Sequence, residues 1–197
     1  GVTTIIHSAF CNCSSLKSIT IPNSVIEIEG WAFYGCKSLT SVTIGNRVTS
    51  IGYYAFRKCT SLESITIPDS VTTIGKEAFY DCSNLTSITI PNGVTTIGNA
   101  AFSGCSSLTS VTIPDSVLLI GEEAFCACSS LTSVTIGNGS AASILNGPFS
   151  IEYGAFANCR SLTSVYCKAT TPPSLGEVAF KYYNDDSFYN IGCKIYV

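Results

Sequence analysis

The chain has 197 residues, of which 46% are hydrophobic and 12% are charged, and its formal net charge is −3. This length and hydrophobic content can supply one long buried core, so we expect a single domain over residues 1–197. The negative charge, with basic residues that form no run in the sequence longer than the pair Arg57–Lys58, argues against nucleic acid or an anionic membrane surface as a partner. No apolar run reaches the roughly 18 residues of a membrane span, so we expect no membrane insertion by this segment.

The dominant pattern is an Ala-Phe pair that recurs eight times, and the first six copies are spaced by 23 residues. A fixed period of about 20 to 50 residues is typical of a solenoid, whose units stack because none can bury its apolar face alone. The phenylalanines of these pairs are Phe10, Phe33, Phe56, Phe79, Phe102, Phe125, Phe156 and Phe180. The period therefore predicts ladders of identical side chains around a shared interior.

The copy over residues 62–84 shows what each coil should contain. Ile65 and Ile67 alternate with polar residues, which predicts a strand with one buried face. A proline then ends the strand, because it lacks the N–H that a ladder needs. Val71 and Ile74 predict a second, shorter stretch that faces inward.

The last part of the copy carries its bulkiest apolar side chains. Ala78, Phe79, Cys82 and Leu85 follow one another at spacings of one, three and three, which predicts a short helical or 3₁₀ turn. Coils that all turn in one sense bring equivalent strands together as neighbours in a parallel sheet, and parallel crossovers are right-handed.

The whole copy, Leu-x-x-Ile-x-Ile-Pro-x-Ser-Val-x-x-Ile-Gly-x-x-Ala-Phe-x-x-Cys-x-x, resembles the BspA-type leucine-rich repeats of surface proteins from anaerobic bacteria and some protists. The resemblance covers essentially all of the chain. It implies an α/β right-handed leucine-rich-repeat solenoid, with one curved parallel β-sheet and short helical or 3₁₀ turns on the opposite side. Residues 169–197, which end in a last strand at Ile195–Val197, look like the divergent closing unit, or cap, of such proteins.

Eleven cysteines would ordinarily suggest disulfides or a metal site. Seven of them occupy one slot of the repeat, where we expect them to face inward as small hydrophobic residues with free thiols. They are Cys13, Cys36, Cys59, Cys82, Cys105, Cys128 and Cys159. Pairing between neighbours and metal binding are the alternatives. Cys167 and Cys193 lie outside this ladder and could form a disulfide.

The outward-facing strand positions are uniform along the chain, with one column of serine and one of threonine. Such residues suit an exposed strand and pair well with like neighbours. They could also form a hydroxyl-rich concave surface for a protein or a glycan. The candidate binding residues on the central strands are Ser64, Thr66, Ser87, Thr89, Ser110 and Thr112.

The repeat is interrupted once, where the spacing from Phe125 to Phe156 is 31 residues, eight more than the period. The extra residues lie within an insertion loop at residues 139–150, and insertions in solenoids often carry binding. Ile144, Leu145 and Phe149 in this loop either contact a partner or fold back over the neighbouring coils.

Catalysis finds little support in the sequence. The sole histidine, His7, lies in the incomplete first copy, so a Ser-His-Asp or Cys-His arrangement would have to form at the frayed end of the solenoid, and we expect His7 to be exposed. Asp185 and Asp186 lack the glycine-containing loop of a calcium site, and we expect no cofactor or metal. The sequence therefore predicts a protein that is not an enzyme.

The resemblance implies cell-surface display and adhesion or partner binding, without naming the partner. We expect an extracellular or cell-surface module that recognises a protein or glycan on a host or neighbouring cell. The alternatives are a structural spacer that displays another domain and a carbohydrate-binding module of a surface enzyme. Because the chain opens within a repeat and without methionine, we expect it to be a segment of a longer protein.

Overall fold

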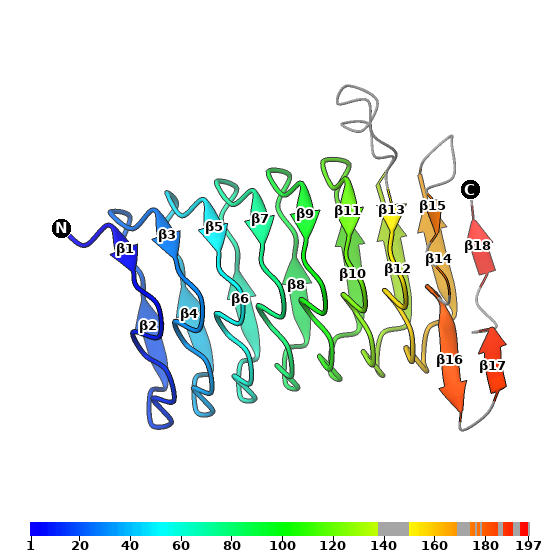
Figure 1. The fold of residues 1–197 in the computed structure, drawn as a ribbon, viewed down its shortest axis with the longest axis horizontal. Helices are drawn as coiled ribbons and strands as arrows, with labels where there is room; N and C mark the ends of the chain where they lie inside the picture. The colour runs from blue at the N-terminus through cyan, green and yellow to red at the C-terminus, as the bar shows by residue number, and fades with distance from the viewer. Residues whose placement is uncertain are drawn as a thin grey trace.

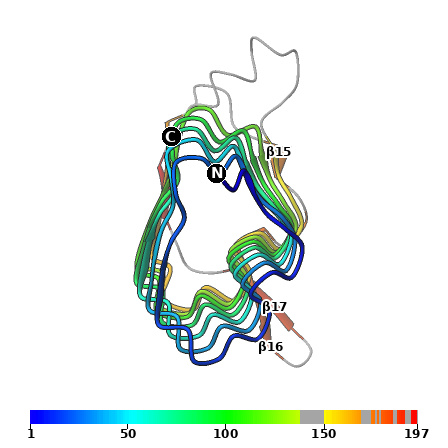
Figure 2. The same ribbon diagram turned by 90° about the vertical axis from the view of Figure 1, so that its left-hand side faces the viewer.

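The computed structural model describes residues 1–137, 150–168, 174–175, 177, 179–184, 187–190 and 194–196. The strands of successive copies lie side by side along one axis, in the order of the chain (Figure 1). Viewed along that axis, the coils lie over one another and share one outline (Figure 2). The prediction of stacked 23-residue coils is confirmed.

Each coil contributes one longer and one two-residue strand, and like strands pair in parallel. The longer strands are β2 (Ser18–Thr20), β4 (Ser41–Thr43), β6 (Ser64–Thr66) and β8 (Ser87–Thr89) in one sheet, and β10 (Ser110–Ile113), β12 (Ser133–Ile136), β14 (Ser164–Cys167) and β18 (Lys194–Tyr196) in another. The short strands are β1 (Thr4–Ile5), β3 (Glu27–Ile28), β5 (Ser50–Ile51), β7 (Thr73–Ile74), β9 (Thr96–Ile97), β11 (Leu119–Ile120), β13 (Ser150–Ile151) and β15 (Ser174–Leu175).

The short strands form a continuous eight-stranded parallel sheet, so the expectation of a single sheet was wrong. Ile74, for example, lies opposite Ile51 on one side and Ile97 on the other. The extended stretch predicted at Val71 and Ile74 becomes a strand because its backbone N–H and C=O groups meet equivalent groups of the neighbouring coils. The interior is therefore enclosed by parallel sheets on two sides.

The predicted helical or 3₁₀ turn is also wrong, because the described residues contain consecutive turns and no helix. Around Phe79, the residues two before and two after, Glu77 and Asp81, have φ of 52° and 57°. This left-handed conformation stops a right-handed helix. The N–H of Phe79 instead donates to the carbonyl of Ala101 in the next coil, at 2.7 Å. The carbonyl of the neighbouring coil thus accepts the hydrogen bond that, in a helix, a carbonyl of the same helix would accept.

The phenylalanines form one continuous stack through the interior. Neighbouring rings have centroids 5.1 to 5.3 Å apart and planes within 8° of parallel, from Phe10 to Phe180. The six rings from Phe33 to Phe156 have no solvent exposure. Burial of a ring of this size contributes about 1.5 to 3 kcal/mol, and each ring is covered by its neighbours on both sides.

Glycines mark the corner before the turns of the third to sixth copies, whereas Glu29 and Glu152 occupy the same slot in the second and seventh. At Gly75 an added Cβ would lie 2.7 Å from the carbonyl carbon of Gly52 and 2.7 Å from the amide nitrogen of Tyr53, both in the preceding coil. A Cβ atom does not fit at that distance from backbone. Glycine is required here by the close approach of two coils.

The stack continues in register across the insertion. Ser150 and Ile151 of β13 pair with Leu119 and Ile120 of β11, although the sequence between them is longer than in other copies. The seventh coil therefore stacks in register on the sixth, despite the longer sequence between them. Most of the predicted loop at residues 139–150 lies outside the described residues.

The predicted cap is described only in part. β16 (Lys181–Asn184) and β17 (Ser187–Asn190) form an antiparallel hairpin, and β18 pairs in parallel with β14. The last strand predicted at Ile195–Val197 is thus present as Lys194–Tyr196. Asp185, Asp186 and Cys193, named in the sequence analysis, lie outside the described residues.

Candidate functional site

The outward positions of β6, β8 and β10 form an array that we call the serine–threonine surface: Ser64, Thr66, Ser87, Thr89, Ser110 and Thr112. All six side chains are exposed, as predicted. Ser64 lies opposite Ser87, and Thr66 lies opposite Thr89, in a parallel register. β8 and β10 are neighbours, so the surface continues from one sheet to the next (Figure 1). Their role in binding stays a prediction.

The hydroxyls of this surface differ from those of the threonines just before each strand. Thr86 donates a hydrogen bond from its hydroxyl to the carbonyl of Glu63 at 3.3 Å, and Thr132 does the same to Thr109 at 3.0 Å. Within the described part of the chain, the hydroxyls of the serine–threonine surface have no such partner. They can therefore bond to water or to a ligand while the backbone beneath them stays fixed.

The other predicted contact residues, Ile144, Leu145 and Phe149, lie outside the described residues. Their role in partner binding stays a prediction. The structure therefore brings together the six strand residues and leaves the loop residues unplaced.

The cysteine ladder is buried and unpaired from Cys36 to Cys159, as predicted. Each thiol donates to a phenylalanine carbonyl of the preceding coil, as Cys82 does to Phe56 at 3.2 Å. Burial raises the pKa of Cys36 to about 11 and raises the pKa of Cys82 further. These thiols therefore stay protonated at neutral pH, and a protonated thiol is a poor nucleophile. Cys13 is exposed, against expectation, because the first coil has a neighbour on one side only.

The described residues provide no metal site and no evident catalytic group. No cluster of three or more His, Cys, Asp or Glu side chains there could hold a metal ion. His7 is exposed, as predicted, and its backbone N–H donates to the carboxylate of Glu29 at 2.6 Å. Cys167 is a free, buried thiol. Over the same part of the chain, no helix has the length and apolar character needed to cross a membrane.

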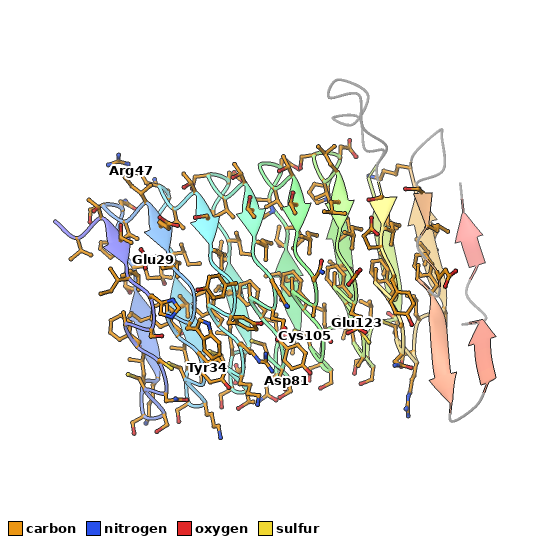
Figure 3. The ribbon with its side chains drawn as sticks, in the orientation of Figure 1. Glu29, Tyr34, Arg47, Asp81, Cys105 and Glu123 are labelled. Atoms are coloured by element: carbon orange, nitrogen blue, oxygen red, sulfur yellow. The ribbon has the colours of Figure 1, made fainter. Side chains whose placement is uncertain are left out.

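A second surface, which we call the turn patch, lies on the outside of the turns of the second to fourth copies. Its centre is Trp31, whose ring centroid lies 4.7 Å from that of Tyr34 and 4.8 Å from that of Tyr54. Tyr53 meets Tyr54 edge-on at 5.6 Å. Tyr34 is labelled in Figure 3, which shows equivalent side chains in rows along the axis. The patch consists of Trp31, Tyr34, Tyr53, Tyr54, Arg57 and Tyr80.

Arg57 connects the rings of the third and fourth copies within the turn patch. Its guanidinium lies 5.3 Å from the ring centroid of Tyr54 and 4.5 Å from that of Tyr80, and it forms an ion pair with Glu77. Cation–π contacts of this kind restrict the guanidinium and hold the rings in place. Burial, with the charge of Asp81 next, raises the pKa of Tyr80, so its hydroxyl remains protonated at neutral pH.

The turn patch was not predicted, because it lies at the variable positions before and after Ala-Phe, whereas the repeat pattern describes only the positions that the copies share. The signal was present in the composition of those positions. The Trp and four Tyr all fall in three consecutive copies, whereas the next two copies have no aromatic residue there. Comparison of the variable positions between copies would have found it.

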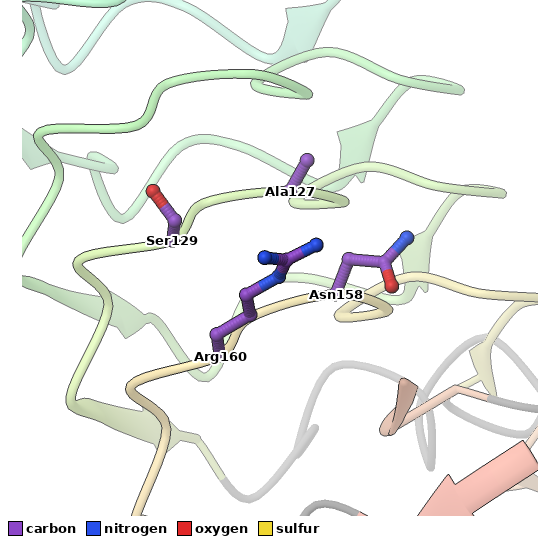
Figure 4. A pocket seen from close by; sticks show the side chains of 4 residues that line it. All are labelled: Ala127, Ser129, Asn158 and Arg160. Atoms are coloured by element: carbon purple, nitrogen blue, oxygen red, sulfur yellow. The ribbon is translucent and has the colours of Figure 1, made fainter. Parts of the chain in front are cut away.

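A shallow hollow of about 350 Å³ lies farther along the same side, between the turns of the sixth and seventh copies (Figure 4). Its lining residues are Ala127, Ser129, Asn158 and Arg160. They include neither a carboxylate nor a thiol, so the lining provides no general acid–base pair and no nucleophile of the usual strength.

Stacked 23-residue coils with parallel sheets on two sides define a leucine-rich-repeat-like solenoid. Residues 1–105 and 49–194 match the family described as the BspA type leucine rich repeat region. The chain belongs to the BspA-type leucine-rich repeat family. The comparison with curated proteins found no match.

Several solved structures are similar to this chain. A leucine-rich repeat protein from T. pallidum is 34% identical, with a TM-score of 0.72, over 81% of this chain and 72% of that one. A leucine-rich repeat protein from Bacteroides ovatus is 27% identical, with a TM-score of 0.65, over 85% of this chain and 59% of that one. The pneumococcal vaccine antigen PcpA is 20% identical, with a TM-score of 0.67, over 88% of this chain and 44% of that one, and this likeness shows the fold alone.

Proposed function

We propose that this chain is a non-enzymatic binding or adhesion module on the outside of a cell, which contacts a protein or glycan through the serine–threonine surface or the 139–150 insertion. The observation that carries the proposal is the array of exposed, unbonded hydroxyls on parallel strands in fixed register. Membership of a repeat family supports it, because solenoids offer extended surfaces for partners. The ladder thiols are compatible with an external location, since burial keeps them protonated and away from oxidants.

The proposal is tested with arrays of extracellular-matrix proteins and of glycans. A variant with Thr66→Glu, Thr89→Glu and Thr112→Glu should lose binding, because each carboxylate covers the hydroxyl array with a bulkier charged group. A matched control places Thr73→Glu on the opposite sheet, where Glu27 of β3 already occupies the equivalent position in register. The control should bind as the wild type does.

The insertion is tested separately by deletion of residues 140–147, which returns the spacing from Phe125 to Phe156 to 23 residues. Binding that disappears with the deletion but survives the threonine variant assigns the contact to the insertion. The competing function is a structural spacer, and it predicts that the wild-type chain binds nothing on either array.

A further inference from the structure

We propose that the turn patch is a binding site for an acidic oligosaccharide. This inference goes beyond the proposed function, because it concerns a face of the solenoid that the serine–threonine surface and the insertion do not use. It depends only on the residues of the turn patch.

The rings of the patch are not needed by the fold. The column of Trp31 and Tyr54 continues as Glu77, Ala100, Glu123 and Gly154 in later copies, with the same stacked turns beneath. A methyl group, a carboxylate or a hydrogen atom therefore serves the fold equally well at this place. The aromatic side chains of the second and third copies need another explanation.

Two of these rings also occupy backbone positions that disfavour them. Trp31 and Tyr54 have φ of 61° and 59°, in the left-handed region where bulky residues are uncommon. The conformation itself belongs to the repeat, since Ser8, Glu77, Ala100 and Glu123 also have positive φ at the same place, and the patch differs only in the bulk of the side chains there. Gly154, at the equivalent place in the seventh copy, has the residue type that this conformation prefers.

Tyr53 is the exposed ring of the patch, and the other members are half-buried and support one another. Tyr53 is 47% exposed and covers Gly30, whose added Cβ would lie 2.6 Å from the tyrosine ring. Trp31, packed between two tyrosines, and Arg57, in contact with two more, cannot reorient freely. A ligand would meet aromatic faces that are already in position, which lowers the entropic cost of binding.

The charge around the rings favours an anionic ligand. The turns at residues 30–37, 53–60 and 76–83 contain twice as many basic as acidic side chains, although the whole chain has a net charge of −3. Lys37 and Lys76 are exposed, whereas Glu77 is engaged by Arg57. The basic residues are Lys37, Arg57, Lys58 and Lys76, and the acidic ones are Glu77 and Asp81. A locally basic surface on an acidic protein attracts anions.

The mixture of rings and charges matches the two sides of a sugar. A pyranose has a face of C–H bonds, which packs on an aromatic ring by dispersion, and an edge of hydroxyls, which bonds to charged and polar side chains. Trp, Tyr and Arg are also enriched at protein interfaces, so a peptide is the competing occupant that the test has to exclude. A uronic acid adds the carboxylate that the lysines can pair with. We therefore favour an acidic glycan over a protein as the occupant.

Trp31 is the only tryptophan of the chain, so its fluorescence reports directly on the patch. The probes are a short oligosaccharide of alternating glucuronic acid and N-acetylglucosamine, a short neutral cello-oligosaccharide and an oligo-glutamate peptide. The acidic oligosaccharide should change the emission in a saturable way below about 1 mM, and the affinity should fall as salt rises from about 50 to about 500 mM. The other two probes should bind at least about tenfold more weakly.

A matched pair of variants locates the site. Tyr53→Ala should weaken binding of the acidic oligosaccharide by about tenfold, since one stacking face is lost. Tyr153→Ala is the control, because Tyr153 occupies the equivalent position in a copy without the patch and is similarly exposed, at 41%. It should bind within about twofold of the wild type.

Several results would overturn the inference. These are an unchanged Trp31 emission with the acidic oligosaccharide, equal binding of the neutral oligosaccharide or of the glutamate peptide, and equal losses in the Tyr53 and Tyr153 variants. Self-association through the patch, seen by sedimentation as a dimer that Tyr53→Ala abolishes, would assign it to a second copy of the chain instead. None of these results bears on the serine–threonine surface, whose test uses other variants.

Discussion

At the scale of single residues, the buried side chains of the repeat pack against the equivalent side chains of the neighbouring coils. Phe79 shows this most simply, since its ring lies 5.3 Å from that of Phe56 and 5.1 Å from that of Phe102. The thiol of Cys82, three residues further along the chain, donates to the carbonyl of Phe56 in the preceding coil. The fold is thus stabilised by ring stacking and hydrogen bonds between neighbouring copies.

The phenylalanine stack predicts a large effect from one truncation. Phe79→Ala should lower the free energy of unfolding by about 3 to 5 kcal/mol, because it leaves a cavity flanked by two rings that cannot close over it. Urea unfolding measures the loss, with Tyr153→Ala as an exposed control. A loss below about 1 kcal/mol for Phe79→Ala would contradict the packing.

The glycine corner predicts an effect from one added methyl group. Gly75→Ala should destabilise the fold by about 1 to 3 kcal/mol, because the new Cβ would meet the backbone of the preceding coil at 2.7 Å. Lys76→Ala, at the exposed next residue, should stay within about 0.5 kcal/mol of the wild type in the same unfolding experiment. Equal stability of the two variants would show that the coils are farther apart than described.

The buried thiols predict a loss of stability at alkaline pH. Burial raises the pKa of Cys59, Cys82 and Cys105 in the folded chain, whereas an unfolded thiol titrates near about 8.5. Because the folded-state pKa is the higher one, the contribution is complete below about pH 8.5 and is lost as the pH rises, by about 1.4 kcal/mol per pH unit for each thiol.

Urea unfolding under reducing conditions, from pH 7.5 upward in steps to about 10.5, measures this dependence. Cys82→Ala removes one titrating group, so the fall in unfolding free energy with pH should be shallower by about 1.4 kcal/mol per unit. Identical slopes in the variant and the wild type would mean that Cys82 ionises as readily in the folded chain as in the unfolded one.

At the scale of the elements, the sequence predicted the strands well and the turns poorly. The alternation at Ile65 and Ile67 has only one structural meaning, so the strand at β6 was found. The spacing of Ala78, Phe79, Cys82 and Leu85 fits a helix as well as a series of turns, and a neighbouring coil decides between them by accepting hydrogen bonds. The second sheet was missed for the same reason, since a two-residue strand such as β7 exists only through its pairing.

A deletion within the insertion tests whether the stability of the solenoid depends on the extra residues. Deletion of residues 140–147 should change the free energy of unfolding by no more than about 1 kcal/mol, because β11 and β13 already pair in register on either side and loop length has a weak effect. Thermal and urea unfolding of the deletion variant check this. A much larger loss would show that Ile144 or Leu145 covers the neighbouring coils, which is the alternative to a partner contact.

At the scale of the whole molecule, the period of the repeat was enough to predict a shared interior, while the candidate sites depend on departures from the period. Exposure of the serine–threonine surface followed from strand alternation alone. The turn patch required a comparison between copies, because nothing in a single copy distinguishes Trp31 from Ala100. The right-handed sense of the coil remains a prediction from the rule for parallel crossovers.

The central claim is that consecutive copies lie directly over one another, and distances between spin labels test it most directly. With the accessible Cys11, Cys13 and Cys126 replaced by serine, one label stays at Thr20→Cys and the second moves to position 89, 112 or 135 in successive variants. The mean distance should rise by about 4.8 Å for each coil. Distances that fail to increase with the number of intervening coils would contradict the account.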